Sequence, residues 1–158
     1  RGWTGDTPLL AALSCPKTND HITCVKVLLA AGAHVNGRHG GIDFALDKVI
    51  GIRKLAAALP PPHWNGVVPN CRRMVSILFQ AGATISDLQW RMMEAGHYND
   101  NSIHPYVVKV MTAGGFKAYA KAHRQKLVAM FVRTRCFPRV PDEIVPLIVD
   151  YGFHVGFY

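Results

Sequence analysis

Long apolar runs are absent from this sequence of 158 residues. Its apolar stretches, such as residues 56–59, fall far short of the ~20 residues that a membrane-spanning helix needs. The composition is nevertheless that of a folded chain, because 49% of the residues are hydrophobic and only 18% are charged. We therefore expect a globular domain without a transmembrane segment, peripheral at most to a membrane.

Closely spaced metal ligands are also absent. The four cysteines include no C-x-x-C pair, and the eight histidines include no H-E-x-x-H motif. Cys15, Cys24, Cys71 and Cys136 each stand in or near an apolar stretch, where a free thiol behaves as a small hydrophobic side chain. We expect free thiols in an intracellular, reducing compartment, the cytoplasm or an organelle interior. Because the chain begins with Arg1, we also expect residues ahead of it, a removed targeting segment being one alternative.

Motifs of catalysis are missing as well. The sequence has no nucleophile elbow, no P-loop, no G-x-G-x-x-G and no pair of carboxylates at a catalytic spacing. The adjacent Asp142 and Glu143 suit the start of a helix better than an acid–base pair. We predict a protein that is not an enzyme, with no catalytic residue, no cofactor and no metal site.

Acidic residues are missing from one long stretch, residues 101–141, which carries eight basic residues. The rest of the chain has ten basic and ten acidic residues, so this stretch accounts for the whole net charge of +8. A basic stretch suits an acidic protein surface, nucleic acid or an anionic membrane surface. We favour a helix that is solvated or faces an acidic protein, and keep nucleic acid or a membrane surface, through residues 109–139, as the alternative.

Three segments of the sequence resemble one another, at residues 25–33, 75–83 and 107–115. In each segment, apolar residues at i, i+3 and i+4 are followed by a glycine, the last residue but one. The spacing predicts a helix with one apolar face, and the glycine predicts a left-handed C-cap. We expect the apolar side chains of the first two helices to be buried, namely Ile22, Val25, Leu28, Leu29, Ile77, Leu78 and Phe79.

The stretch before the first copy carries a family resemblance. Residues 7–12 read T-P-L-L-A-A and are similar to the ankyrin-repeat motif T-P-L-H-x-A, with Leu10 in place of the usual His. Thr7 suits the cap of a first helix and Pro8 suits its first position. Residues 21–36 resemble the second helix and the following turn of the same repeat. The resemblance implies an all-α solenoid of helix pairs, and its alternative is a generic helical bundle.

Later repeats match the ankyrin pattern less well. Ala45-Leu46-Asp47 resembles a variant of the opening motif without Thr or Pro, and the third repeat is predicted to begin at Asp87. The Pro-rich residues 51–70 predict an inserted loop, and residues 97–105 a second loop. We assign the degenerate repeats to residues 1–115, divided near 1–36, 37–86 and 87–115. In the first loop, His63 and Trp64 are candidate partner contacts.

The remaining residues, 116–158, predict a basic helical extension. Residues 116–135 contain no Pro and no Gly and suit one long helix, which we expect to cap the end of the repeat stack. Its apolar face is predicted to hold Tyr119, Leu127, Val128, Phe131 and Val132. Candidate partner contacts on this helix are its basic residues, Lys117, Lys121, Arg124, Lys126, Arg133 and Arg135.

A last helix is predicted from Asp142 onward. One apolar helical face is formed by Ile144, Leu147, Ile148 and Tyr151, whereas the proline Pro146 is tolerated only near a helix start. Residues 140–148 resemble the opening of an F-box-like helix. A SOCS box fits less well, because Leu127 is followed by Phe131 where that box has a cysteine. That resemblance implies a ligase-recruiting box, but we favour the alternative, a short amphipathic helix that packs on the domain.

Together these features predict a binding module. The ankyrin resemblance implies a non-catalytic scaffold for protein–protein interaction, and we expect an accessory subunit of a larger assembly. One alternative is a substrate adaptor that recruits a ubiquitin ligase through the C-terminal box. Another is a ribonucleoprotein subunit that uses the basic helix.

Overall fold

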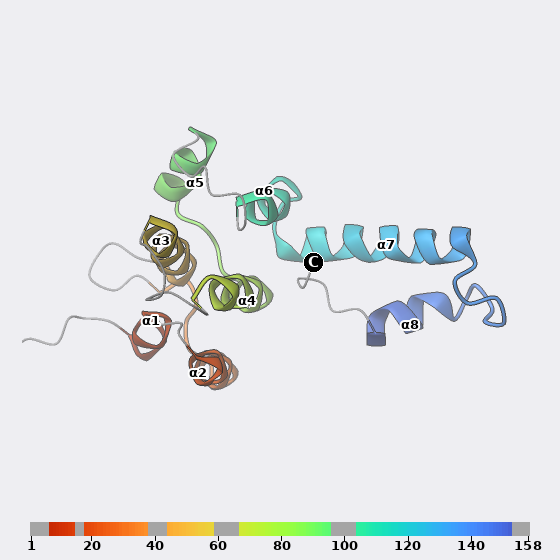
Figure 1. Cartoon of the computed structure of the whole chain (residues 1–158), viewed down its shortest axis with the longest axis horizontal. Coiled ribbons are helices and arrows are strands. Elements are labelled where there is room, and N and C mark those ends of the chain that lie inside the picture. The colour runs from red at the N-terminus through yellow and green to blue at the C-terminus, as the bar shows by residue number, and fades with distance from the viewer. Residues whose placement is uncertain (1–6, 15–17, 38–43, 59–66, 96–103, 153–158) are drawn as a thin grey trace, which may run out of the picture. The chain divides into compact units, whose positions relative to one another are not determined.

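All regular structure in the described part of the chain is helical (Figure 1). The computed structural model describes residues 7–14, 18–37, 44–58, 67–95 and 104–152. The all-α prediction is therefore confirmed for these residues. The helices are α1 (Pro8–Leu13), α2 (Asn19–Ala30), α3 (Ala45–Ala58), α4 (Val67–Gln80), α5 (Asp87–Glu94), α6 (His104–Thr112), α7 (Phe116–Thr134) and α8 (Val145–Gly152).

The chain forms two compact units, residues 1–108 and residues 109–158. The division falls within α6, whereas the sequence pattern places the start of the basic extension at residue 116. The N-terminal unit holds α1 to α5 with the first turn of α6. The C-terminal unit holds α7 and α8 with the end of α6.

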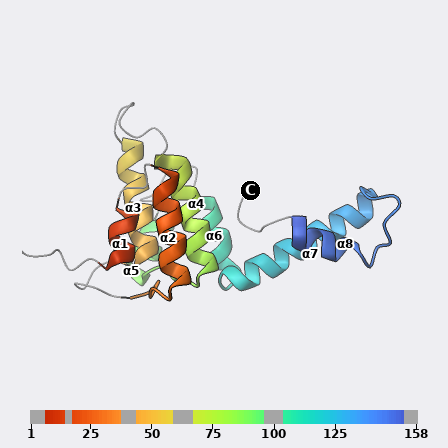
Figure 2. The same cartoon turned by 90° about the horizontal axis from the view of Figure 1, so that it is seen from below.

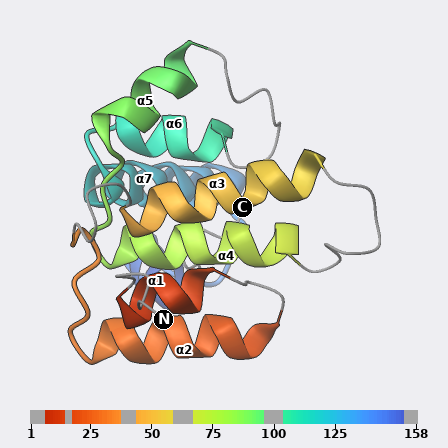
Figure 3. The ribbon, with the colours of Figure 1, turned by 90° about the vertical axis from the view of Figure 1, so that its left-hand side faces the viewer.

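The first four helices of the N-terminal unit pack as two pairs, and the two pairs lie against each other. Helix α1 packs on α2 and α3 packs on α4, while α1 also lies against α3 and α2 against α4 (Figures 2 and 3). The core between them consists of fully buried aliphatic side chains, each of which stabilises the fold by about 1.5–3 kcal/mol relative to exposure. The largest are Leu9, Leu13, Val25, Leu46, Val49, Val67, Met74, Val75 and Leu78.

Helix starts in this unit follow from local side-chain chemistry. The Thr7 Oγ1 accepts a hydrogen bond from the Leu10 N–H at 3.2 Å, and Pro8 is the first residue of α1. This confirms both predicted roles. Ser86 caps α5 in the same way, since its Oγ accepts from the Gln89 N–H at 3.2 Å. Each cap satisfies one of the N–H groups that a helix start leaves without a partner.

Three helices end in the same glycine cap. The φ angles of Gly32, Gly82 and Gly114 are 86°, 86° and 84°. After α2, the Gly32 N–H donates to the Leu29 carbonyl and the next N–H donates to the Leu28 carbonyl, both at 3.0 Å. The same two bonds recur after α4 and α6, at 2.9–3.0 Å. This is the Schellman geometry, and it confirms the glycine caps predicted from the sequence.

The two predicted loops are shorter than expected. Helix α3 runs to Ala58 and α4 starts at Val67, so much of residues 51–70 is helical. Pro69 fits because it is the third residue of α4, where no intrahelical N–H is needed. Helix α6 starts at His104, so the second loop ends earlier than residue 105.

Burial also differs in part from the prediction. Ile22, Val25, Leu78 and Phe79 are buried as expected. Leu28, Leu29 and Ile77 are only half-buried, because they lie at the edge of the face by which their helices pack.

The prediction for the cysteines is confirmed for the absence of disulfides but only partly for burial. Cys24, Cys71 and Cys136 form no disulfide, as expected, and Cys15 lies outside the described residues. Only Cys71 is a buried side chain, since Cys24 and Cys136 are exposed. The expectation of a core position is wrong for these two.

The C-terminal unit is a pair of packed helices with little core. Helix α7 covers the predicted range, yet none of its side chains is fully buried. Its five predicted apolar residues are half-buried. Helix α8 packs on α7, and Phe131 and Phe137 lie with their ring centroids 5.5 Å apart at the end of α7.

The apolar face predicted for the last helix is not its most buried face: Ile148 is half-buried, and the side chain of Tyr151 lies outside the described residues. The buried side chains of α8 are Val145 and Val149, each 2% exposed, whereas Ile144 and Leu147 are 42% and 51% exposed. The helix begins at Val145 rather than at Asp142, which places Pro146 at its second residue. At that position proline costs no intrahelical hydrogen bond, so it fits the helix start.

Candidate functional site

Six of the eight candidate contact residues lie on α7 or at its end. Lys117, Lys121, Arg124, Lys126 and Arg133 belong to the helix, and Arg135 is its C-cap. All six side chains are exposed. The other two candidates, His63 and Trp64, lie outside the described residues.

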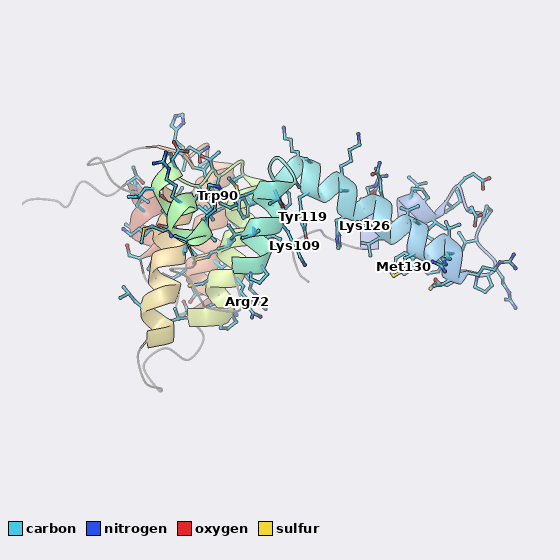
Figure 4. All side chains as sticks on the ribbon, turned by 90° about the horizontal axis from the view of Figure 1, so that it is seen from above. Arg72, Trp90, Lys109, Tyr119, Lys126 and Met130 are labelled. Carbon is cyan, nitrogen blue, oxygen red and sulfur yellow. The ribbon has the colours of Figure 1, made fainter. Side chains whose placement is uncertain are left out.

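The basic side chains of α7 point in two directions. Lys117, Lys121 and Arg124 share one face, because residues three and four apart are neighbours on a helix. Lys126 is five residues after Lys121 and so lies about 140° around the helix from it. Arg133 follows Lys126 by seven residues and returns to that second face. Figure 4 labels Lys126 and Met130, four residues apart, on this second side.

Arg124 forms an ion pair within the C-terminal unit. Its Nη2 donates to the Asp150 Oδ2 at 2.6 Å, and its Nε pairs with Oδ1 of the same carboxylate. The bond is bidentate and joins α7 to α8. Both side chains are more than 40% exposed, so the pair contributes at most about 1 kcal/mol to stability. Its effect is to fix the spacing of the two helices and to neutralise Arg124.

Arg135 ends α7 in an unfavourable backbone conformation. It is the one described non-glycine residue with a positive φ, 46°. Its N–H donates to the Val132 carbonyl at 3.2 Å, and the next N–H, of Cys136, donates to the Phe131 carbonyl at 3.3 Å. This is the cap that glycine makes in the other three helices, here made by arginine at a cost of about 1–2 kcal/mol.

A groove lies along the first basic face of α7. It is an open space of about 410 Å³ between α7 and the start of α8. Apolar side chains line most of it, and the basic residues stand at the end nearer the start of α7. The lining residues are Lys121, Arg124, Gln125, Val128, Ala129, Val132 and Pro146. Val128 and Val132, which the sequence pattern places on the apolar face of the helix, are half-buried and line this groove.

Two polar side chains, an amide and a carboxylate, form hydrogen bonds between distant segments of the N-terminal unit. The Asn36 amide donates to the Gly82 carbonyl, and its carbonyl oxygen accepts from the Thr84 N–H, both at 2.9 Å. The turn after α2 is thereby tied to the turn after α4. The Asp47 carboxylate accepts from the Ser86 N–H at 3.4 Å. These links were not identified from the sequence, because they join residues 39 to 48 positions apart.

Other exposed features are dispersed. Val27, Leu55 and Leu88 are 61–71% exposed, on three different helices of the N-terminal unit. Among the described residues, no three His, Cys, Asp or Glu side chains gather as metal ligands would. No helix in the described ranges combines the length and the apolar character needed to cross a membrane.

Comparison with models of known protein families, with curated proteins and with solved structures finds no match for this chain. The geometry of the chain therefore carries the functional argument.

Proposed function

We propose that the chain is a non-catalytic protein-interaction module built on degenerate ankyrin-type repeats, and that it serves as an accessory or scaffold subunit of a larger assembly. The observation that carries the proposal is the repeated glycine cap, identical in its two hydrogen bonds after α2, α4 and α6. A generic helical bundle does not require the same cap at the end of every second helix.

The packing order supports the same proposal. First helices lie against first helices and second helices against second, as α1 does with α3 and α2 with α4. Asn36 joins one inter-repeat turn to the next. Stacks of this kind present exposed turns and first helices, and such surfaces bind proteins. The function still lies in the surface rather than in the fold, so the proposal needs a test of binding.

Size-exclusion chromatography of an extract from the native cells tests this function. We expect the native chain to elute at an apparent mass much larger than that of a 158-residue monomer. The purified chain should elute as a small protein under the same conditions. The purified chain is the matched control, because it reports self-association. Elution of the native chain at the position of the purified one would contradict the proposal.

A second candidate function rests on α8. Ile144 and Leu147 are exposed apolar side chains in the segment that resembles an F-box-like helix. An adaptor for a ubiquitin ligase would present such side chains to the ligase. The double change Ile144→Ser and Leu147→Ser should then remove ligase subunits from the purified native complex, while the buried Val145 and Val149 keep α8 in place. Absence of ligase subunits from the unaltered complex would exclude this candidate.

A further inference from the structure

The groove between α7 and α8 differs from the rest of the basic surface. Its lining residues on α7 follow the spacing i, i+3, i+4, i+7, i+8 and i+11 from Lys121, so they form one continuous stripe of the helix. Val128, Ala129, Val132 and the ring of Pro146 supply the apolar part. The groove is thus an apolar hollow with a cationic end.

Lys121 gives the groove its charge. The other cation in the lining, Arg124, is held by the Asp150 carboxylate. Lys121 is exposed and forms no ion pair within the part of the chain that the structure describes. No acidic residue occurs between positions 101 and 141, so α7 itself offers Lys121 no partner. The ammonium group of Lys121 is therefore open to pairing with a negatively charged group of a ligand.

We propose that this groove binds an amphipathic helical segment of a partner protein, with apolar side chains in the hollow and a carboxylate paired with Lys121. The inference rests on the proposed interaction function and names its surface and its class of partner. Helix-in-groove binding needs an apolar row and a polar rim, and both are present here.

Nucleic acid fits this groove poorly. Strands are held by rows of cations along the phosphates and by aromatic side chains that stack on the bases. The groove lining includes no aromatic residue and one cation that is not already paired. Lys126 and Arg133, which would add to a row of cations, lie on the other side of α7. A flat membrane surface does not enter a hollow of this kind.

Fluorescence anisotropy with the full chain tests the proposal. The probe is a labelled synthetic helix with leucines at i, i+3, i+4 and i+7 and glutamates along its rim. The matched probe has lysines in place of the glutamates. We expect the acidic helix to bind at least about tenfold more tightly, since the charge pairs across the rim are complementary. Equal binding of the two probes would overturn the proposal, as would tighter binding of a single-stranded oligonucleotide or of phosphatidylserine vesicles.

Paired variants locate the binding to the groove. Lys121→Glu should abolish the preference for the acidic helix, whereas Lys126→Glu, the same charge change on the other side of α7, should leave a clear preference. Ala129→Gln should weaken the binding of both probes, because the larger side chain fills the hollow. Met130→Gln, at the neighbouring position, should leave the binding of both probes unchanged. All four side chains are exposed, so the fold should persist, and circular dichroism checks this.

Equal effects within either pair would overturn the groove assignment. If the groove fails this test while the native chain still elutes as a large assembly, only the groove is wrong. If the native chain elutes as a free monomer, the proposed function itself is wrong.

Discussion

The two units of this chain use helices in opposite ways. In the N-terminal unit, helices such as α4 bury whole side chains, and Met74, Val75 and Leu78 are 0% exposed. In the C-terminal unit, the longest helix, α7, buries no side chain fully. The N-terminal unit ends α2 and α4 on glycine, whereas α7 ends on Arg135. The first unit buries apolar side chains in a core, whereas α7 of the second leaves charged and apolar side chains exposed or half-buried.

The largest expected difference between the units concerns their cores. Leu78→Ala should destabilise the N-terminal unit by about 2–5 kcal/mol, because it leaves a cavity in a fully buried site. Leu127→Ala on α7 should cost less than about 2 kcal/mol, because its site is half-buried.

Denaturant unfolding followed by two signals measures both effects. Trp3, Trp64 and Trp90 are the tryptophans of the chain and all precede residue 109, so their fluorescence reports on the N-terminal unit. Far-ultraviolet circular dichroism reports on both units. Equal losses for the two variants would show that α7 has a core like that of α4.

The Asn36 bridge is expected to have the next largest effect. Asn36→Ala removes two hydrogen bonds between successive turns and should destabilise the N-terminal unit by about 1–2 kcal/mol. Asn36→Asp keeps the oxygen that accepts from the Thr84 N–H and should lose about half as much. Hydrogen exchange of the Thr84 amide measures the bond directly. Unchanged protection in Asn36→Ala would show that the bridge does not hold the turns together.

Glycine caps can be compared with a helix-interior glycine. Gly82→Ala should destabilise by about 1 kcal/mol, because alanine is strained at a φ of 86°. Gly51→Ala, in the middle of α3, should instead stabilise by about 0.5–1 kcal/mol. An added Cβ meets no atom within 4 Å at either site, so the contrast is one of backbone conformation. Melting temperatures that move in the same direction would contradict the cap assignment.

The smallest expected effect comes from the arginine cap. Arg135→Gly should stabilise the C-terminal unit by about 0.5–1 kcal/mol, because glycine adopts the left-handed backbone conformation of this position without strain. Arg133→Gly, two residues earlier within α7, should destabilise by about as much, since glycine weakens a helix interior. Thermal unfolding by circular dichroism measures both changes. A loss of stability in Arg135→Gly would mean that its side chain stabilises the fold.

Much of the N-terminal unit could be predicted because its rules are local. Thr7, Pro8, Gly32 and Gly82 each fulfil a backbone requirement that few other residues meet, so the residue type reveals the geometry. The loop at residues 51–70 is shorter than its prolines predict, because the chain up to Ala58 continues α3 and Pro69 fits the first turn of α4. The Asn36 bridge gave no local signal, since its partners are 46 and 48 residues away.

The C-terminal unit was harder to predict because its helices carry overlapping apolar stripes. In residues 144–149, the pair Ile144 and Leu147 and the pair Val145 and Val149 both follow a helical spacing. Periodicity shows that a helix is amphipathic but does not show which of two stripes meets α7. The groove depends on that choice, so the sequence indicated the basic residues around it and not the hollow itself.

Photo-cross-linking in the native cells tests the interaction account most directly. A photoreactive phenylalanine analogue is placed at Gln125, which lines the groove, or at Leu88 on α5, which is 71% exposed. The account predicts discrete protein adducts from position 125, and their loss when Lys121→Glu is added. Irradiation that yields no protein adduct from either position, or only nucleic-acid adducts from position 125, would contradict it.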